Sequence, residues 1–332
     1  MSRAAAVLAI LFGLALAASA DAQSIKVGML KSSGSGAAYL AQERGYFAAE
    51  GLSVEIVPFD SAQPIAVALA SGDVDVSSTG FTAGFFSLAG KGMLRIIAGT
   101  TLEIPGVQFQ PFLVSNRAYE TGLRTFRDFP GHSFALSQIG SPTHYALGLI
   151  ADKYGFDLKS MRLLALQSIG NTVSAIVGGQ VDLTMMPGNT AVPLLQKGQA
   201  KLVGYVGDET PYQLAGVMVS GKTADTRGDM IRHFLAAYRK GAKDYDAAFF
   251  NADRKRVDEP SARAVAEIIG KHINQTADQV LISIAYVDPE LRLDVKDTLH
   301  QLTWYQSQGM VKADADGNAI VDRRYAVPLP GN

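Results

Sequence analysis

The alternation of apolar and polar residues along the chain predicts short strands separated by helices. SIKVGML (24–30), LSVEIVPF (52–59) and VDVSST (74–79) are rich in apolar and β-branched residues, as strands are. AYLAQERGYFAAEG (38–51) and PIAVALASG (64–72) have helical spacing, and each ends at a glycine, the residue favoured after a helix C-terminus. Helices placed between strands in this way predict βαβ units and a largely parallel sheet.

The same order of elements recurs later in the chain. HSFALSQ (132–138), MRLLALQ (161–167) and VDLTMM (181–186) are predicted strands. PTHYALGLIADKYGF (142–156) and NTVSAIVGGQ (171–180) are predicted helices between them. This second series predicts a second parallel sheet.

Two short motifs occur once in each series. GSGAAY (34–39) and GSPTHY (140–145) share an initial Gly-Ser and a final Tyr, and ALASGDVDV (68–76) matches AIVGGQVDL (175–183) as A-x-x-x-G-x-V-D. Either the chain has built one unit twice, or any two βαβ layers look alike at helix ends. Both interpretations give the same fold class, α/β with two Rossmann-like lobes of similar build.

The part of the chain from about 225 to 309 is predicted to be mainly helical. One segment, GDMIRHFLAAYRKGAKDYDAAFF, forms a single apolar stripe at three- and four-residue steps, consisting of Ile231, Phe234, Leu235, Tyr238 and Ala242. We expect these helices to pack around one lobe and to carry little chemistry.

The first residues have the pattern of a secretory signal peptide. Arg3 precedes an apolar run from Ala4 to Ala18, and Ala20-Asp21-Ala22 is an A-x-A cleavage site. We expect residues 1–22 to be removed and the mature protein to reach the periplasm. About 310 residues then remain, which is enough for two domains or lobes.

Composition excludes several classes of function. The net charge is −1 at pH 7, so no basic field indicates nucleic acid or an anionic membrane as partner. There is no cysteine, and the five histidines show no short metal-ligand spacing. The sequence also lacks H-E-x-x-H, a G-x-S-x-G elbow and a Walker loop. We therefore expect no metal, no cofactor and no enzymatic activity.

The GSPTHY segment is the strongest candidate for a binding site. Ser141 follows a predicted strand and precedes Pro142, which suits the first helical position, so Ser141 is predicted to cap the helix. The N–H groups of Thr143 and His144 would then lie at the positive end of a helix, where an anion binds well. The Thr143 hydroxyl and the His144 imidazole would add donors. The alternative is an ordinary capped helix without a ligand.

The other predicted strand-to-helix turns, at 33–37, 79–82, 168–172 and 187–190, are also rich in Gly, Ser, Thr and Asn. In open α/β sheets, ligands bind in the crevice at the carboxyl ends of the strands, where these turns emerge. Phe81 or Tyr212 would line an apolar wall of the site, which would suit an organic ligand. The alternative for Phe81, and for Phe85 and Phe86 after it, is burial in the core. With the residues of GSPTHY, the full set of candidate ligand-binding residues is Ser35, Gly36, Thr79, Gly80, Phe81, Ser141, Thr143, His144, Asn171, Asn189 and Tyr212.

Several stretches resemble a known family. ERGYFAAEGLSVEI, ALASGDVDVSSTG, LAGKGMLRIIAG and FRDFPGHSFALSQIGSPTHYALGLIADKYGFDL are similar to the periplasmic solute-binding proteins of ABC importers of the sulfonate, taurine and nitrate type. The resemblance covers roughly residues 24–220. It departs from the usual D-L-x-G-K stretch at Phe129, Pro130 and His132.

The resemblance implies a type II periplasmic binding-protein fold, in which two lobes are joined by two crossovers. One lobe would comprise 24–113 and 218–332 and the other 114–217, with crossovers near 111–117 and 212–220. Family members hold their solute with the turn after the first strand, the turn at 79–81 and the helix start at 141–144. These turns coincide with the polar turns identified above.

The resemblance also implies partners. We expect a monomer that binds a small organic anion, such as a sulfonate, a taurine-like solute or an aromatic carboxylate, and delivers it to the transmembrane subunits of an ABC permease. One alternative is a ligand-sensing partner of a membrane receptor. The other is a periplasmic enzyme, since a related branch makes the thiamine pyrimidine precursor with a cysteine-rich motif and a pyridoxal-bearing lysine. The absence of cysteine counts against that enzyme.

Overall fold

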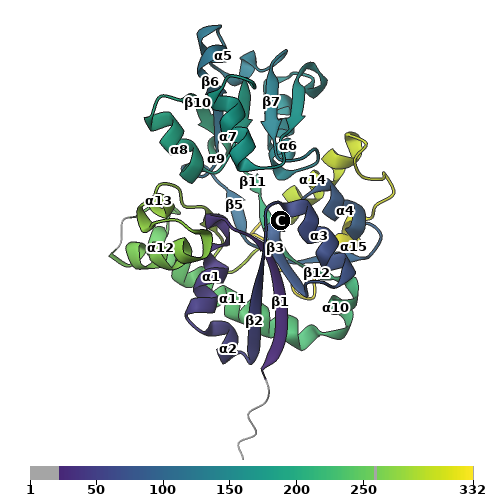
Figure 1. Ribbon diagram of the computed structural model, residues 1–332. Coiled ribbons are helices and arrows are strands. Elements are labelled where there is room, and N and C mark those ends of the chain that lie inside the picture. Colours follow the sequence, from purple (N-terminus) through teal and green to yellow (C-terminus); the bar gives the residue numbers. More distant parts are fainter. Residues whose placement is uncertain (1–21, 258–259, 332) are drawn as a thin grey trace, which may run out of the picture.

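The protein consists of two α/β lobes joined by a small central sheet, as a computed structural model shows (Figure 1). The structure describes residues 22–257 and 260–331, so all but the last residue of the expected signal peptide lies outside the described residues. No helix in the described part of the chain is long and apolar enough to cross a membrane.

The sheet of lobe 1 has the strand order β2-β1-β3-β12-β4. Strands β1, β2 and β3 are parallel, and β12 runs antiparallel between β3 and β4. The bounds of these strands are β1 Gln23–Leu30, β2 Leu52–Phe59, β3 Val76–Gly80, β4 Leu94–Gly99 and β12 Ala215–Ser220. The predicted strands at 24–30, 52–59 and 74–79 are thus confirmed.

The sheet of lobe 2 repeats this topology, with the order β8-β7-β9-β6-β10. Its strands β7, β8 and β9 are parallel, and β6 runs antiparallel between β9 and β10. The bounds are β6 Pro111–Ser115, β7 Ser133–Leu136, β8 Arg162–Ala165, β9 Leu183–Met185 and β10 Ala200–Tyr205. Two lobes of similar build are therefore present, as the recurring order of elements predicted.

Helices cover the faces of both sheets. The predicted helix at 38–51 is divided, because Gly45 adopts a left-handed conformation with φ of 70° between α1 and α2. The apolar stripe predicted for the segment after residue 228 lies on one long helix, α11, and is buried. The bounds are α1 Gly36–Glu43, α2 Tyr46–Ala49, α3 Ala62–Ser71, α4 Ala83–Ala89, α5 Asn116–Glu120, α6 Pro142–Tyr154, α7 Ile169–Val177, α8 Gly188–Gln196, α9 Val206–Glu209, α10 Gly221–Thr226, α11 Gly228–Phe249, α12 Pro260–Ile273, α13 Ala277–Leu281, α14 Val295–Ser307 and α15 Gly317–Ile320, with 3₁₀ turns at Ser33–Ser35, Phe126–Asp128 and Leu158–Ser160.

The chain passes between the lobes through a three-stranded sheet in the order β11-β5-β13. Its strands are β5 Thr101–Glu103, β11 Tyr212–Gln213 and β13 Tyr286–Val287. The expected crossover at 111–117 is corrected, because β6 belongs to the lobe 2 sheet. The expected crossover at 212–220 includes β12 of lobe 1. We therefore propose lobe boundaries in the segments 104–110 and 206–214, since the boundaries expected at 113 and 217 fall inside strands.

Helix α14 joins the two lobes on one side of the molecule, where Figure 1 shows it beside α4 and below α6. The hydroxyl of Tyr305 lies 3.0 Å from the carbonyl oxygen of Ser141 in lobe 2 and 3.4 Å from that of Phe81 in lobe 1. Tyr145 of α6 donates a hydrogen bond to Asp297 of α14 at 2.8 Å. The C-terminal helices therefore do more than pack around one lobe.

Glu103 in β5 is a buried carboxyl group whose two oxygens have no hydrogen-bond partner among the described residues. Burial, followed by the nearby Asp208, raises its pKa well above the usual value. Because the folded pKa lies above the unfolded value of about 4.3, the folded state binds the extra proton, and stability falls as the pH rises above about 4.3. We expect Glu103→Gln to raise the melting temperature at pH 7 and to leave it nearly unchanged at pH 4.

Thermal melts across this pH range measure the effect, with the exposed Glu267→Gln as a matched control. The control should follow the wild type at every pH. Equal melting temperatures for Glu103→Gln and wild type at pH 7 would contradict a buried carboxyl group with a raised pKa in the connecting sheet.

Candidate ligand-binding cleft

A cleft of about 640 Å³ lies between the two lobes. Its walls are the turns that follow β1, β2 and β3 in lobe 1 and β7, β8 and β9 in lobe 2. This is the carboxyl edge of both parallel sheets, where α/β proteins bind ligands. Cavities of this size are typical of sites for small organic molecules.

Six of the sequence-predicted residues line this cleft. The structure brings together Ser35, Thr79 and Gly80 from lobe 1 with Ser141, Thr143 and Asn171 from lobe 2. Ser35 is held by a hydrogen bond from its hydroxyl to the carbonyl oxygen of Leu30 at 3.0 Å. Asn171 donates from its side chain to the carbonyl oxygen of Leu166 at 2.9 Å.

The start of α6 has the geometry that the sequence predicted. Ser141 is the N-cap residue, its hydroxyl accepts from the N–H of His144 at 3.4 Å, and Pro142 occupies the first turn. Thr143 follows it and faces the cleft. Pro142 has no N–H and the N–H of His144 is held by Ser141, so Thr143 is the residue whose N–H and hydroxyl this end offers to a ligand, together with the positive potential of the helix.

The two lobes meet closely at this helix start. A Cβ atom on Gly80 would lie 2.7 Å from Cγ of Pro142, so only glycine permits this approach. The N–H of Ala83 in lobe 1 donates to the carbonyl oxygen of Gly140 in lobe 2 at 2.9 Å. Gln138 of lobe 2 donates to the hydroxyl of Ser61 in lobe 1 at 3.2 Å. The lobes are therefore in contact along one rim of the cleft.

His144 lies outside the cleft, which corrects its expected role. Its side chain is 2% exposed, and its ring packs edge-on against Trp304 at 5.2 Å between centroids. Nδ1 accepts a hydrogen bond from the N–H of Gly140 at 3.1 Å, so it is the neutral ring that fits here. Burial lowers the pKa of His144 to about 4. Since the unfolded value is about 6.5, this residue loses its stabilising contribution as the pH falls from about 6.5 to 4.

Four other predicted residues also lie outside the cleft. Phe81 is fully buried beside Phe85, with ring centroids 5.7 Å apart, so the core alternative holds. Tyr212 is buried against Tyr145. The other two residues contact the C-terminal part of the chain. Gly36, the first residue of α1, packs against Tyr245 and Ile269, and the Asn189 side chain donates a hydrogen bond to Gln275 at 2.9 Å.

Several lining residues were absent from the sequence-based set. Lys31 and Asp60 follow the paired strands β1 and β2 and are the charged residues among those that line the cleft. Gln138 and Gln167 follow β7 and β8, and their positions after predicted strands could have identified them. Gln110 could not be identified in this way, because its place depends on the path between the lobes. The remaining wall includes apolar residues, among which are Phe59, Phe109, Leu136, Ile169, Met185, Met186 and Leu214.

Residues 33–248 match the family described as NMT1/THI5 like. This match covers well over half of the 332 residues. The chain belongs to the NMT1/THI5 like family. A search of curated proteins finds no match. The matched segment of this family member includes every residue of lobe 2 that lines the cleft. It also includes the lining turns after β1, β2 and β3, except Lys31 and Ser32, which precede it.

Solved structures show the fold of this NMT1/THI5 like chain. The alkanesulfonate-binding protein SsuA from Xanthomonas axonopodis pv. citri, bound to MOPS, has a TM-score of 0.71 at 17% identity, over 91% of this chain and 99% of that one. The periplasmic nitrate-binding protein NrtA from Synechocystis PCC 6803 has a TM-score of 0.71 at 11% identity, over 92% and 87%. The expected two-lobed binding-protein fold is confirmed.

An enzyme has the same fold. The desulfurization enzyme DSZB has a TM-score of 0.62 at 14% identity, over 92% of this NMT1/THI5 like chain and 96% of that one. The fold is therefore compatible with catalysis as well as with solute binding, and the function depends on the residues of the cleft.

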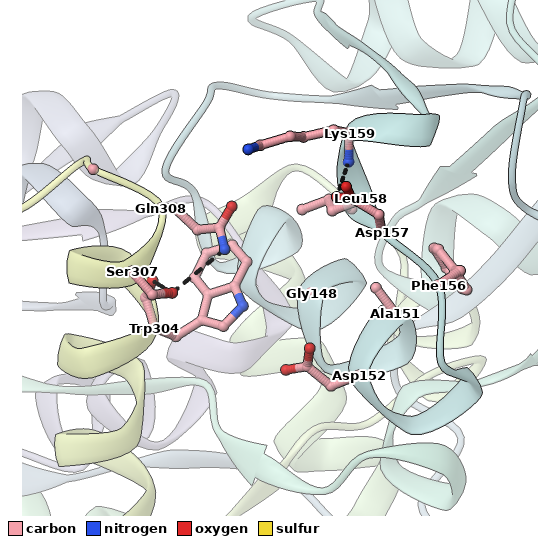
Figure 2. Close-up of a pocket in the computed structure, with 11 residues that line it drawn as sticks. Gly148, Ala151, Asp152, Phe156, Asp157, Leu158, Lys159, Trp304, Ser307 and Gln308 are labelled. Atoms are coloured by element: carbon pink, nitrogen blue, oxygen red, sulfur yellow. Dashed lines mark hydrogen bonds between the residues drawn. The ribbon is translucent and has the colours of Figure 1, made fainter.

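A second hollow, of about 470 Å³, lies between α6 and α14, away from the cleft. Figure 2 shows the indole of Trp304 directed toward Gly148 of α6, with Ser307 and Gln308 on the α14 side. A Cβ atom on Gly148 would overlap the indole ring. We assign no ligand to this hollow, because Trp304 and Gly148, which lie at its centre, pack against each other.

Proposed function

We propose that this protein is a periplasmic solute-binding protein that captures a small organic anion between its lobes and delivers it to an ABC permease. The observation that carries the proposal is the start of α6, where Thr143, with its backbone N–H and its hydroxyl, faces a cleft between two lobes. The solved neighbours that bind alkanesulfonate and nitrate support an anionic ligand. Secretion through a cleavable signal peptide and a monomeric state belong to the same proposal.

The energy of such a complex must come from several contacts. Micromolar binding corresponds to about −8 kcal/mol, whereas one helix N-terminus contributes roughly 0.3 to 2 kcal/mol. Hydroxyl and amide groups from both lobes and the apolar wall near Met185 and Leu214 can supply the remainder. Closure of the lobes would bury the solute among them.

We expect Thr143→Ala to weaken binding of an organic anion by about tenfold, because one hydrogen bond to a charged group is lost. The melting temperature of the empty protein should change little, since no hydrogen bond of the Thr143 side chain holds the described structure together. A thermal-shift screen of sulfonates and carboxylates followed by calorimetry measures the affinity. Thr190→Ala, in the first turn of α8 but outside the lining, is the matched control.

An unchanged affinity in Thr143→Ala would contradict an anion site at α6.

An enzyme is the second candidate, because the desulfurization enzyme DSZB has the same fold as this protein. Turnover of a bound acid would support that candidate in place of the binding protein. A neighbouring gene for a sensor kinase, instead of neighbouring genes for a permease and an ATPase, would favour a role in ligand sensing.

A further inference from the structure

Among the described residues that line the cleft, two carry a charge, Lys31 after β1 and Asp60 after β2. Both residues are exposed, so a solute that enters the cleft can reach them. Neither side chain forms a hydrogen bond or an ion pair within residues 22–257 and 260–331. The cleft therefore presents one basic and one acidic group that a ligand with the opposite charges can pair.

The sheet of lobe 1 places these two residues side by side. Leu30 pairs with Phe59 where β1 and β2 run parallel. Lys31 and Asp60 are the next residues along these two strands. Neighbouring strands lie about 4.8 Å apart. This spacing suits two opposite charges that lie close together on one small molecule, such as the ammonium and carboxylate groups of an amino acid.

One turn of lobe 2 lies across the same strand ends. Gln138, in this turn, donates to Ser61 in the turn after β2 at 3.2 Å. Further along, Pro142 meets Gly80 at the end of β3, where a Cβ atom on the glycine would lie 2.7 Å from the proline ring. Strand β1 lies between β2 and β3 in the sheet. Lys31 therefore lies between the turn after β2 and the start of α6.

This order gives the two charged groups of a ligand different places. The start of α6 offers the N–H and the hydroxyl of Thr143 to an anionic group, with Lys31 on the adjacent strand of lobe 1. Asp60 lies one strand further from α6, beyond Lys31. A purely anionic solute meets the unpaired carboxylate there, whereas an ammonium group at the same place is attracted to it.

The opposite side of the cleft is apolar. Leu214 precedes β12, the strand beyond β3 in lobe 1, and Met185 ends β9, the strand beyond β7 in lobe 2. Both residues line the cleft, on the side away from the edge strand β2. A solute held by its charged groups therefore has room for an apolar substituent on this side.

We infer that the cleft selects an amino acid with an apolar side chain. Its carboxylate lies between the start of α6 and Lys31, and its ammonium group pairs with Asp60. Its side chain extends toward Leu214 and Met185. This inference rests on the proposed function and narrows its organic anion to acids that carry an ammonium group beside the anionic group.

Calorimetry with two pairs of acids tests this inference. The pairs are L-leucine with 4-methylpentanoate and L-phenylalanine with 3-phenylpropanoate, and the members of each pair differ only by the ammonium group. In the better-bound pair, the wild type should prefer the amino acid by about tenfold or more, because the other acid lacks the partner of Asp60. Asp60→Asn should abolish this preference and leave the melting temperature of the empty protein nearly unchanged, since no hydrogen bond or ion pair of the described structure is lost.

Asp314→Asn is the matched control, because Asp314 is also an exposed aspartate without a side-chain partner in the described part of the chain, and it lies outside the lining. It should retain the full preference. Equal affinity within both pairs, or a preference that survives in Asp60→Asn, would overturn the amino-acid ligand while leaving the proposed anion site intact. Binding of none of the four acids would also overturn the inference, and the screen of sulfonates and carboxylates would then decide the proposed function separately.

Discussion

Replacing Gly148 by alanine is expected to lower the free energy of unfolding by about 3 kcal/mol. Gly148 lies in the middle of α6, and the indole of Trp304 occupies the space that a Cβ atom would need. Trp304 is 5% exposed and packs against both His144 and Tyr145, so it has little freedom to withdraw. The substitution therefore separates α6 of lobe 2 from α14.

Urea denaturation followed by circular dichroism measures this loss. Trp304 is the only tryptophan in the sequence, so the emission of the folded variant also reports whether the indole has moved into water. Gly170→Ala is the matched control, because the nearest atom to a Cβ on Gly170 is 4.0 Å away. A Gly148→Ala variant as stable as the control would contradict the packing of α14 on α6.

His144→Ala is expected to cost about 2 to 3 kcal/mol of stability and to leave the affinity for an organic anion within about twofold of wild type. The imidazole fills a buried space beside Trp304 and accepts the hydrogen bond from Gly140. Its removal creates a cavity and leaves the Gly140 N–H without its acceptor. The side chain does not line the cleft, so no direct contact with the solute is lost.

The pair of variants Thr143→Ala and His144→Ala distinguishes binding from stability. The first should affect affinity alone and the second stability alone, as calorimetry and urea denaturation measure them. A tenfold loss of affinity in a folded His144→Ala protein would place the imidazole in the site and would contradict the geometry of α6.

The fold could be predicted because each strand and helix carries its own local pattern. The β-branched runs of β1 and β2 and the glycines that end the helices depend on near neighbours in sequence. The crossovers could not be predicted in this way. The composition of PFLVS predicts a buried strand but does not indicate to which lobe it belongs. Only its pairing with β9 and β10 assigns it to lobe 2.

The candidate site could be predicted at the level of turns but only partly at the level of side chains. Ser141, Thr143 and His144 lie in one turn of helix, and successive residues of a helix point in different directions. Thr143 faces the cleft and His144 faces α14. The position of α14 depends on contacts between segments more than a hundred residues apart, so nothing in GSPTHY indicated which residue would meet the ligand.

The central claim is that a small organic anion binds between the lobes at the start of α6. A crystal structure of the protein with the acid that gives the largest thermal shift tests it most directly. The account predicts density for that acid in the cleft, with its anionic group within hydrogen-bond distance of Thr143 at the start of α6. Density for the acid in the hollow beside Trp304, with an empty cleft, would contradict it.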